Sequence, residues 1–168
     1  MLAVTTERSY DMIFDLTRIA ALIAVLGIAV VYGTDVFCAI VMRPALASVD
    51  DNALVAVTGN VHRYGDRRMP VPWVLGFLAA AVSGVLAAVT AHWTQAIAAG
   101  AAVVLLSIWL VLYTQVSAPI NRQLTAAADA GQPLPNGRVL QAKWDRIIGA
   151  RAMLQGLALA ALCAVLMI

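Results

Sequence analysis

VPWVLGFLAAAVSGVLAAVTAHWTQAIAAGAAVVLLSIWLVLYTQV, residues 71–116, consists of two long apolar runs separated by the polar link His92-Trp93-Thr94-Gln95. A helix needs about 20 mostly apolar residues to cross the hydrocarbon core of a bilayer, and residues 71–91 and 96–116 each reach that length. Because the link is so short, the two runs must lie antiparallel to each other. This stretch therefore predicts a helical hairpin that crosses a membrane twice.

Two more apolar runs flank the hairpin, at residues 19–41 and 147–168. Charged residues make up 12% of the chain and apolar residues 62%, whereas a soluble domain carries roughly 25% charged residues. The sequence therefore predicts one all-α domain over residues 1–168, an integral membrane four-helix bundle. Trp73 and Trp93 at the ends of the second span fit the aromatic belts of the membrane interfaces. Small residues at every fourth position let two of the spans approach their neighbours closely; they are Gly76, Ala80, Gly84 and Ala88, and Gly156, Ala160 and Ala164.

The composition indicates membrane lipid as a partner and excludes nucleic acid. The net charge is only +2, and aromatic residues make up 7% of the chain. A nucleic-acid-binding surface needs a basic patch, and no basic run with interleaved aromatic residues is present. Whether the chain forms a homo-oligomer or joins a larger membrane complex stays open.

Arginine and lysine are distributed unevenly between the two sides of the predicted bundle. The side of the termini carries Arg8 and Arg18. The two long loops, residues 43–70 and 119–146, hold most of the remaining basic residues: Arg43, Arg63, Arg67, Arg68, Arg122, Arg138, Lys143 and Arg146. The positive-inside rule places both long loops in the cytoplasm, and we interpret the membrane as a bacterial plasma membrane.

Both long loops are predicted to contain short interfacial helices. Ser48 followed by Asp51 has the spacing of a capping box, which predicts a helix over residues 49–64 that ends at Gly65, a natural C-cap. In the third loop, the Gly- and Pro-rich run 131–137 ends a second helical segment.

Asp35 and Arg151 are the charged residues inside the predicted spans. Charge is costly in lipid, and arginine cannot lose its proton to escape that cost. The sequence therefore predicts that Arg151 finds an acceptor within the bundle, with Asp35 as the leading partner. Asp35 shares a helix face with Tyr32, and Arg151 shares one with Trp144. Asp35 is interpreted either as half of a structural ion pair or as a functional group, a proton acceptor or a group that orients a ligand.

The polar residues of the third span suggest a cavity. Ser107, Thr114 and Asn121 follow one another at heptad spacing. With the face of Arg151, they predict a polar cavity that opens toward the long loops. The alternative is a set of hydrogen bonds that only holds the helices together.

His62 is the histidine on the side of the long loops, whereas His92 lies on the opposite side. Histidines on opposite sides cannot share a metal ion, and no His/Cys cluster has metal-ligand spacing. We therefore expect no dedicated metal site, and no motif predicts an organic cofactor, so the cofactor stays unknown. His62 is either an ordinary surface histidine or a base beside the cavity.

Three short motifs stand in order along the chain. They are HRYGDRRMP at residues 62–70, PINRQL at residues 119–124, and Trp144 followed seven residues later by Arg151. These motifs resemble the aromatic-x-x-Gly-x-x-x-Met-Pro, Pro-x-Asn-x-x-Leu and Trp-x6-Arg segments of the anthrone oxygenase-like family, a group of small four-span membrane proteins. The resemblance extends over nearly the whole chain.

Fungal members of that family are associated with the oxidation of anthrones to anthraquinones without a bound organic cofactor. The resemblance, together with the face of Asp35, implies these substrate-binding residues: Tyr32, Tyr64, Arg68, Asn121, Arg122 and Trp144. Such chemistry needs a base and a cation near the developing oxyanion. Asp35, His62 and Arg151 are therefore the candidate catalytic residues.

Two functions follow as alternatives. The first is a membrane-embedded oxygenase or related redox enzyme that acts on a small hydrophobic molecule of aromatic, phenolic or quinone-like type. The second is a non-catalytic accessory subunit or small-molecule-binding protein. Convergence of Asp35, Asn121, Trp144 and Arg151 around a void favours the enzyme, and a solid hydrogen-bonded core favours the subunit.

Overall fold

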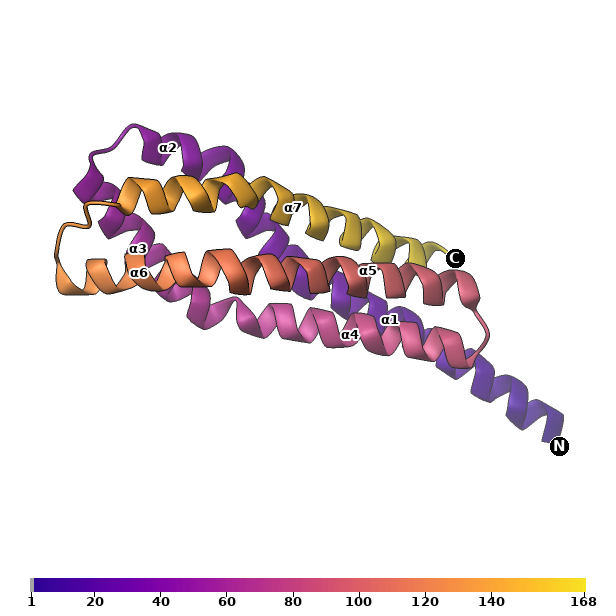
Figure 1. Ribbon diagram of the computed structural model, residues 1–168. Helices are drawn as coiled ribbons and strands as arrows, with labels where there is room; N and C mark the ends of the chain where they lie inside the picture. The colour runs from indigo at the N-terminus through magenta and orange to yellow at the C-terminus, as the bar shows by residue number, and fades with distance from the viewer. Residues whose placement is uncertain (1) are drawn as a thin grey trace.

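The computed structural model describes the backbone of residues 2–168 and the side chains of residues 12–168, so the side chain of Arg8 lies outside the described part. Every regular element in this part is helical (Figure 1). In chain order the elements are α1 (Leu2–Phe37), the π-helical turn η1 (Cys38–Met42), α2 (Arg43–Ala47), α3 (Asp51–Arg68), α4 (Pro70–Val89), α5 (Trp93–Leu112), the π-helical turn η2 (Tyr113–Ser117), α6 (Ala118–Ala130) and α7 (Gly137–Met167).

The predicted all-α membrane bundle is confirmed. Four helical stretches are long and apolar enough to cross a bilayer: Met12–Ala47, Pro70–Val89, Trp93–Ala130 and Gly137–Met167. The second matches its predicted span closely. The third and fourth continue well beyond the predicted apolar runs, because α6 and the first turns of α7 extend the same helices into the polar end of the molecule.

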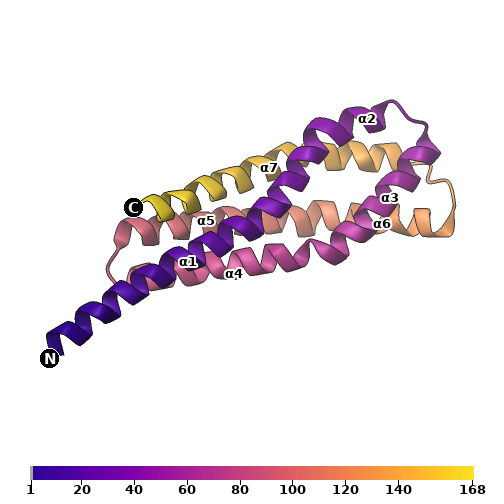
Figure 2. The same ribbon diagram turned by 180° about the vertical axis from the view of Figure 1, so that it is seen from behind.

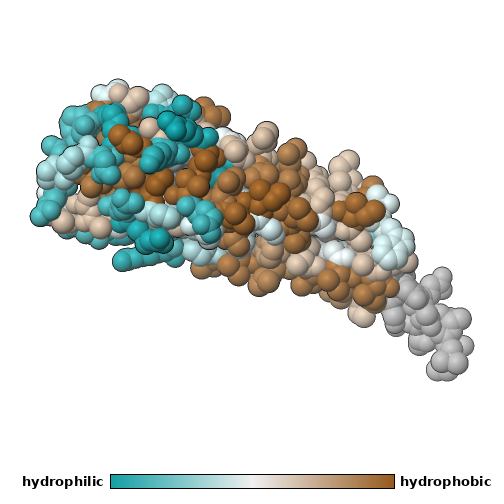
Figure 3. Space-filling view, viewed as in Figure 1, coloured by the Kyte–Doolittle hydropathy of each residue, from teal (hydrophilic) through white to brown (hydrophobic). Residues whose placement is uncertain are grey.

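The bundle has an apolar half and a polar half, which lie end to end (Figures 1 and 2). In the apolar half α1, α4, α5 and the C-terminal part of α7 pack together; in the polar half α3 packs on α6 beside the start of α7. The surface follows this division, with hydrophilic residues gathered at the end formed by α2, α3 and α6 (Figure 3). The helices of the long loops are therefore present as predicted, but they continue the length of the bundle.

The ends of α3 differ from the prediction. Asp50, and not Ser48, caps the helix: its carboxylate accepts the backbone N–H groups of Asn52 and Ala53, both at 2.9 Å. Gly65 does not end the helix, which continues to Arg68. A glycine C-cap requires a left-handed backbone, and among the described glycines only Gly131 has one, at φ 60°. The predicted break after α6 is thereby confirmed.

Close backbone approach between α1 and α4 depends on two glycines. A Cβ atom placed on Gly27 would lie 2.6 Å from the carbonyl oxygen of Pro72 and 3.0 Å from the Cα of Gly76. A Cβ atom on Gly33, two turns further along the same helix, would meet nothing within 4 Å. The small-residue pattern of the second span therefore does mark a helix contact.

We expect Gly27→Ala to destabilise the protein by about 1–3 kcal/mol, because the new methyl group forces two backbones apart. Gly33→Ala is the matched control. It should be neutral or stabilising by up to about 1 kcal/mol through helix propensity alone. Thermal unfolding in lipid nanodiscs, followed by circular dichroism, measures both; equal effects of the two substitutions would contradict the close approach.

Candidate functional site

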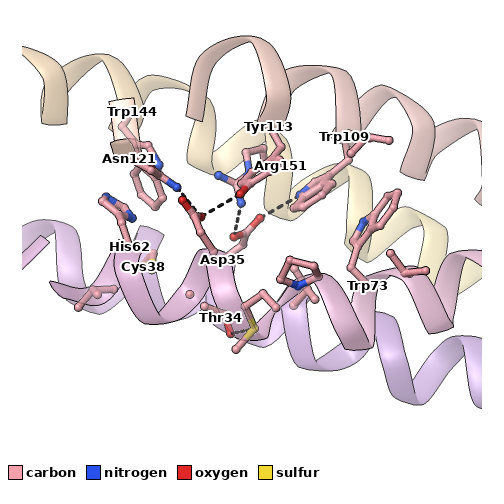
Figure 4. A pocket seen from close by; sticks show the side chains of 18 residues that line it. Thr34, Asp35, Cys38, His62, Trp73, Trp109, Tyr113, Asn121, Trp144 and Arg151 are labelled. Atoms are coloured by element: carbon pink, nitrogen blue, oxygen red, sulfur yellow. Dashed lines mark hydrogen bonds and ion pairs between the residues drawn. The ribbon is translucent and has the colours of Figure 1, made fainter. Parts of the chain in front are cut away.

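A cavity of about 240 Å³ lies where the apolar half meets the polar half. Trp73 and Trp109, from the core of the apolar half, border it on one side, and Cys38 and Trp144, from the core of the polar half, border it on the other. Its polar and aromatic lining consists of Thr34, Asp35, His62, Asp66, Trp73, Trp109, Tyr113, Asn121, Trp144 and Arg151 (Figure 4). The predicted convergence of Asp35, Asn121, Trp144 and Arg151 around a void is confirmed.

The predicted ion pair between Asp35 and Arg151 lies against this cavity. Arg151 Nη2 donates to Asp35 Oδ1 at 2.8 Å, and Arg151 Nη1 donates to the Ser117 hydroxyl at 2.7 Å. The second oxygen of Asp35 accepts Trp109 Nε1–H at 3.0 Å and Gln155 Nε2–H at 2.6 Å. Arg151 and Asp35 therefore share one direct hydrogen bond, because the other terminal nitrogen of the guanidinium, Nη1, donates to Ser117. Both side chains are about 5% exposed, so the charges are shielded from lipid by protein.

Aromatic rings surround the guanidinium of Arg151. Its central carbon lies 5.0 Å from the ring centre of Trp109, 5.6 Å from that of Tyr113 and 5.5 Å from that of Trp144. A cation over an aromatic face is attracted by the ring quadrupole, more strongly when water is excluded. These rings and Asp35 together stabilise a charge that an apolar helix would otherwise not tolerate.

The two π-helical turns lie at the level of the cavity. Each is closed by a backbone hydrogen bond across five residues, from Arg43 N–H to the Cys38 carbonyl and from Ala118 N–H to the Tyr113 carbonyl. A proline follows each turn by two residues, Pro44 and Pro119. A proline ring clashes with the carbonyl four residues earlier in an ordinary helix, and in both cases that carbonyl belongs to the wider π turn.

The turn η2 aligns the residues that hold Arg151. Trp109, Tyr113 and Ser117 are spaced four apart and all reach the guanidinium. In an uninterrupted α-helix of 3.6 residues per turn, residues spaced by four drift around the axis. The extra residue in a π turn reduces that drift, which agrees with the enrichment of such turns at functional sites.

Asp66 joins three elements below the cavity. Its Oδ1 accepts the Tyr113 hydroxyl at 2.9 Å and Asn121 Nδ2–H at 2.8 Å. The resemblance predicted Asn121 as a site residue, whereas neither Asp66 nor Tyr113 was predicted. Asp66 stands directly before the pair Arg67-Arg68, and such a run of charges is typical of a solvated surface, so no signal in the sequence indicated a buried role.

His62 is 5% exposed and packs on Trp144, with the ring centres 5.4 Å apart. Burial lowers the pKa of His62 from 6.5 to about 4; the Asp66 carboxylate opposes this shift and the Arg151 guanidinium adds to it. The imidazole is therefore neutral near pH 7. His62 is not the surface histidine of the simpler interpretation but a buried side chain of the cavity wall.

Several buried donors of the cavity wall have no acceptor among the described residues. They are Trp73 Nε1, Trp144 Nε1 and Arg151 Nε, and His62 Nε2 is also without a partner there. Buried polar atoms in proteins nearly always have a hydrogen-bond partner. A cluster of unpaired donors between aromatic walls is suited to a ligand that brings acceptor oxygens.

Four predicted substrate-binding residues do not line the cavity: Tyr32, Tyr64, Arg68 and Arg122. The ring of Tyr32 lies against Gly156 of α7. Tyr64 and Arg68 lie one turn apart on the outer face of α3, where the guanidinium is 5.1 Å from the exposed ring. Arg122 is exposed next to the buried Asn121. Helix rotation, which short motifs do not reveal, turns these side chains away.

Two other predictions were wrong. Ser107 and Thr114 do not face the cavity, because their hydroxyl groups donate to carbonyl oxygens of their own helix, Val103 at 2.7 Å and Leu110 at 2.9 Å. Trp73 is not an interfacial anchor: it is 8% exposed and stacks on Trp109 with ring centres 5.5 Å apart.

Within the described residues, no three His, Cys, Asp or Glu side chains gather closely enough to hold a metal ion. Comparison of the chain with models of protein families, with curated proteins and with solved structures gives no match.

Proposed function

We propose that the chain is a membrane-embedded oxygenase or related redox enzyme that binds an aromatic, phenolic or quinone-like molecule in this cavity. The observation that carries the proposal is the set of unpaired donors, Trp144 Nε1 and Arg151 Nε, beside the neutral His62 in an aromatic-walled cavity. The aromatic lining from Trp73, Trp109 and Trp144 suits a flat ligand, and the donors suit its oxygen atoms. The resemblance to the anthrone oxygenase-like family supports the same class of substrate.

The chemistry that these groups support begins with proton transfer. Neutral His62 accepts a proton from an acidic C–H or O–H group of the substrate. Arg151 and Trp144 stabilise the oxyanion that forms, because their N–H groups are fixed in a water-poor site. Molecular oxygen is the oxidant: an anthrone-type CH₂ group and O₂ yield a ketone and one molecule of water. Asp35 fits the base less well than His62, because both of its oxygens already accept hydrogen bonds.

The alternative, a non-catalytic subunit or binding protein, is favoured by the direct contact between Asp35 and Arg151. A paired and hydrogen-bonded charge can hold α1, α5 and α7 together without taking part in chemistry. In either function we propose that the polar half faces the cytoplasm of a bacterial plasma membrane, as the basic residues of the long loops suggest.

Tryptophan fluorescence tests the proposal, because three of the four tryptophans line the cavity and Trp93 is 63% exposed elsewhere. Titration of the protein in lipid nanodiscs with a naphthoquinone should give saturable quenching. Trp144→Phe keeps a ring but removes the donor, so binding should weaken about five- to tenfold. Trp93→Phe, the control, should leave the affinity unchanged.

The same preparation separates the two functions. With anthrone and oxygen, the enzyme should consume oxygen and form anthraquinone faster than protein-free nanodiscs. Saturable binding without turnover favours the binding protein. Absence of both would contradict a cavity built for aromatic ligands.

A further inference from the structure

The mouth of the cavity is apolar. The lining residues that are also exposed at the surface are Val61, Pro70 and Val74, of which Val61 is 40% and Val74 45% exposed. None of the polar lining residues is exposed: Asp35, His62, Asn121 and Arg151 are deeply buried, with Asp35 at 3% and Arg151 at 5%, and Thr34, Asp66 and Tyr113 are half-buried. A mouth that faced water would expose polar groups, so the cavity opens toward an apolar medium.

The mouth of the cavity lies near the level of the lipid headgroups. It lies at the junction of α3 and α4, where the exposed residues Arg67 and Arg68 directly precede the apolar span that begins at Pro70. Basic residues at the end of a span lie at the headgroup level. The mouth therefore spans the headgroup level, with Val61 of α3 on the polar side of the two arginines and Val74 of α4 on the acyl-chain side. Beside it, the Thr34 hydroxyl of α1 donates to Met69 Sδ at 3.9 Å, and both residues line the cavity.

An exposed apolar row begins at the mouth and continues along α4. After Val74 it is formed by Leu78, Val82 and Val85, with exposed fractions of 57%, 50% and 62%. These residues repeat at helical spacing along α4, which belongs to the apolar half (Figure 1). A chain-like group that leaves the cavity would lie along this row in the lipid.

The size of the cavity decides how much of a ligand it holds. Its volume of about 240 Å³ is below the roughly 300–1,000 Å³ of pockets that surround drug-sized ligands. It accommodates an aromatic head of up to three fused rings, and any long substituent must extend through the mouth.

From the apolar mouth, the small cavity and the row on α4, we infer that the natural ligand is an amphipathic, bilayer-dissolved molecule of quinone or phenol type. Its oxygen-bearing aromatic head occupies the cavity, its apolar tail lies along Val74 and Leu78, and it enters sideways from the membrane. This inference rests on the proposed function, because it assumes that the cavity holds an aromatic head.

The test compares naphthoquinone with the same head carrying a decyl chain, both titrated in nanodiscs at known mole fractions in the lipid and followed by tryptophan quenching. The tail stays in lipid before and after binding. At equal mole fraction, the two affinities should therefore agree within about threefold. A decyl compound that binds more than about tenfold more weakly would overturn the inference, because the tail would then have no way out.

A variant beyond the mouth checks the route of the tail. Leu78→Trp should weaken binding of the decyl compound about tenfold or more by blocking the path of the tail, and should change naphthoquinone binding by less than about threefold, because Leu78 does not line the cavity. Leu75→Trp is the matched control: Leu75 is 55% exposed on the same helix, lies outside the row and does not line the cavity. An equal effect of both substitutions on the decyl compound, or none at Leu78, would overturn the route. If the inference about the tail fails but naphthoquinone still binds, the proposed function remains intact. Absence of naphthoquinone binding to the unaltered protein contradicts both the proposed function and this inference.

Discussion

Replacing Arg151 by methionine is expected to destabilise the bundle by about 3–5 kcal/mol, because it leaves the buried carboxylate of Asp35 without its compensating charge. Methionine keeps much of the volume of arginine, so the lost charge dominates over the lost packing. The Ser117 hydroxyl also loses its partner. Thermal or denaturant unfolding in nanodiscs measures the loss.

Two controls make the Arg151 result specific. The double variant Asp35→Asn with Arg151→Met removes both charges and should recover most of the stability, since a neutral replacement of a buried pair costs little. Arg138→Met breaks the pair with Asp51, whose side chains are 43% and 68% exposed, and should cost at most about 1 kcal/mol. If Arg151→Met cost no more than Arg138→Met, the buried pair would have no part in holding the helices.

Replacing His62 by glutamine should lower the rate of anthrone oxidation by about 10²- to 10⁴-fold, the usual contribution of a general base. His92→Gln is the matched control, because His92 is exposed at the opposite end of the bundle. A loss of binding without a loss of rate in the bound complex would assign His62 to the cavity wall only.

The pH dependence gives a second measurement on His62. The base acts only when neutral, so the rate should fall as the pH drops through about 4, and not near 6.5. The stability should follow the same shift: between pH 6.5 and 4 the unfolded chain binds a proton that the folded chain does not. The free energy of unfolding should therefore decrease by up to about 3 kcal/mol over this window and then level off. His62→Gln should remove this contribution.

The sequence predicted the number of spans and the central ion pair from the same physical fact, the high cost of placing charge in lipid. Long runs that are almost free of charge mark the spans, and the two charged residues inside them need a partner. Asp35 and Arg151 had no other charged residue at their depth to pair with. Rotation about the helix axis was harder to predict. Tyr64 and Arg68 belong to the same short motif as His62, yet of these three only His62 lines the cavity.

The residues that were missed depend on the π-helical turns. Trp109 and Tyr113 were read as part of an apolar run, and an ideal helix does not align both of them with Ser117. Pro44 and Pro119 were the available signal, because a proline inside a continuing helix requires a local change in backbone geometry. Gly65 gave a false signal for a helix end. Glycine is typical of that position, but a C-cap depends on the backbone angle, which the sequence does not state.

The alignment of the two π-helical turns has a mechanical consequence. Both interrupt their helices at the level of the cavity, whereas α7 (Gly137–Met167) passes from the polar half to the apolar half without interruption. Helix bends occur preferentially at such turns. The cavity therefore lies at the level where two of its helices bend most easily, beside a third that is continuous.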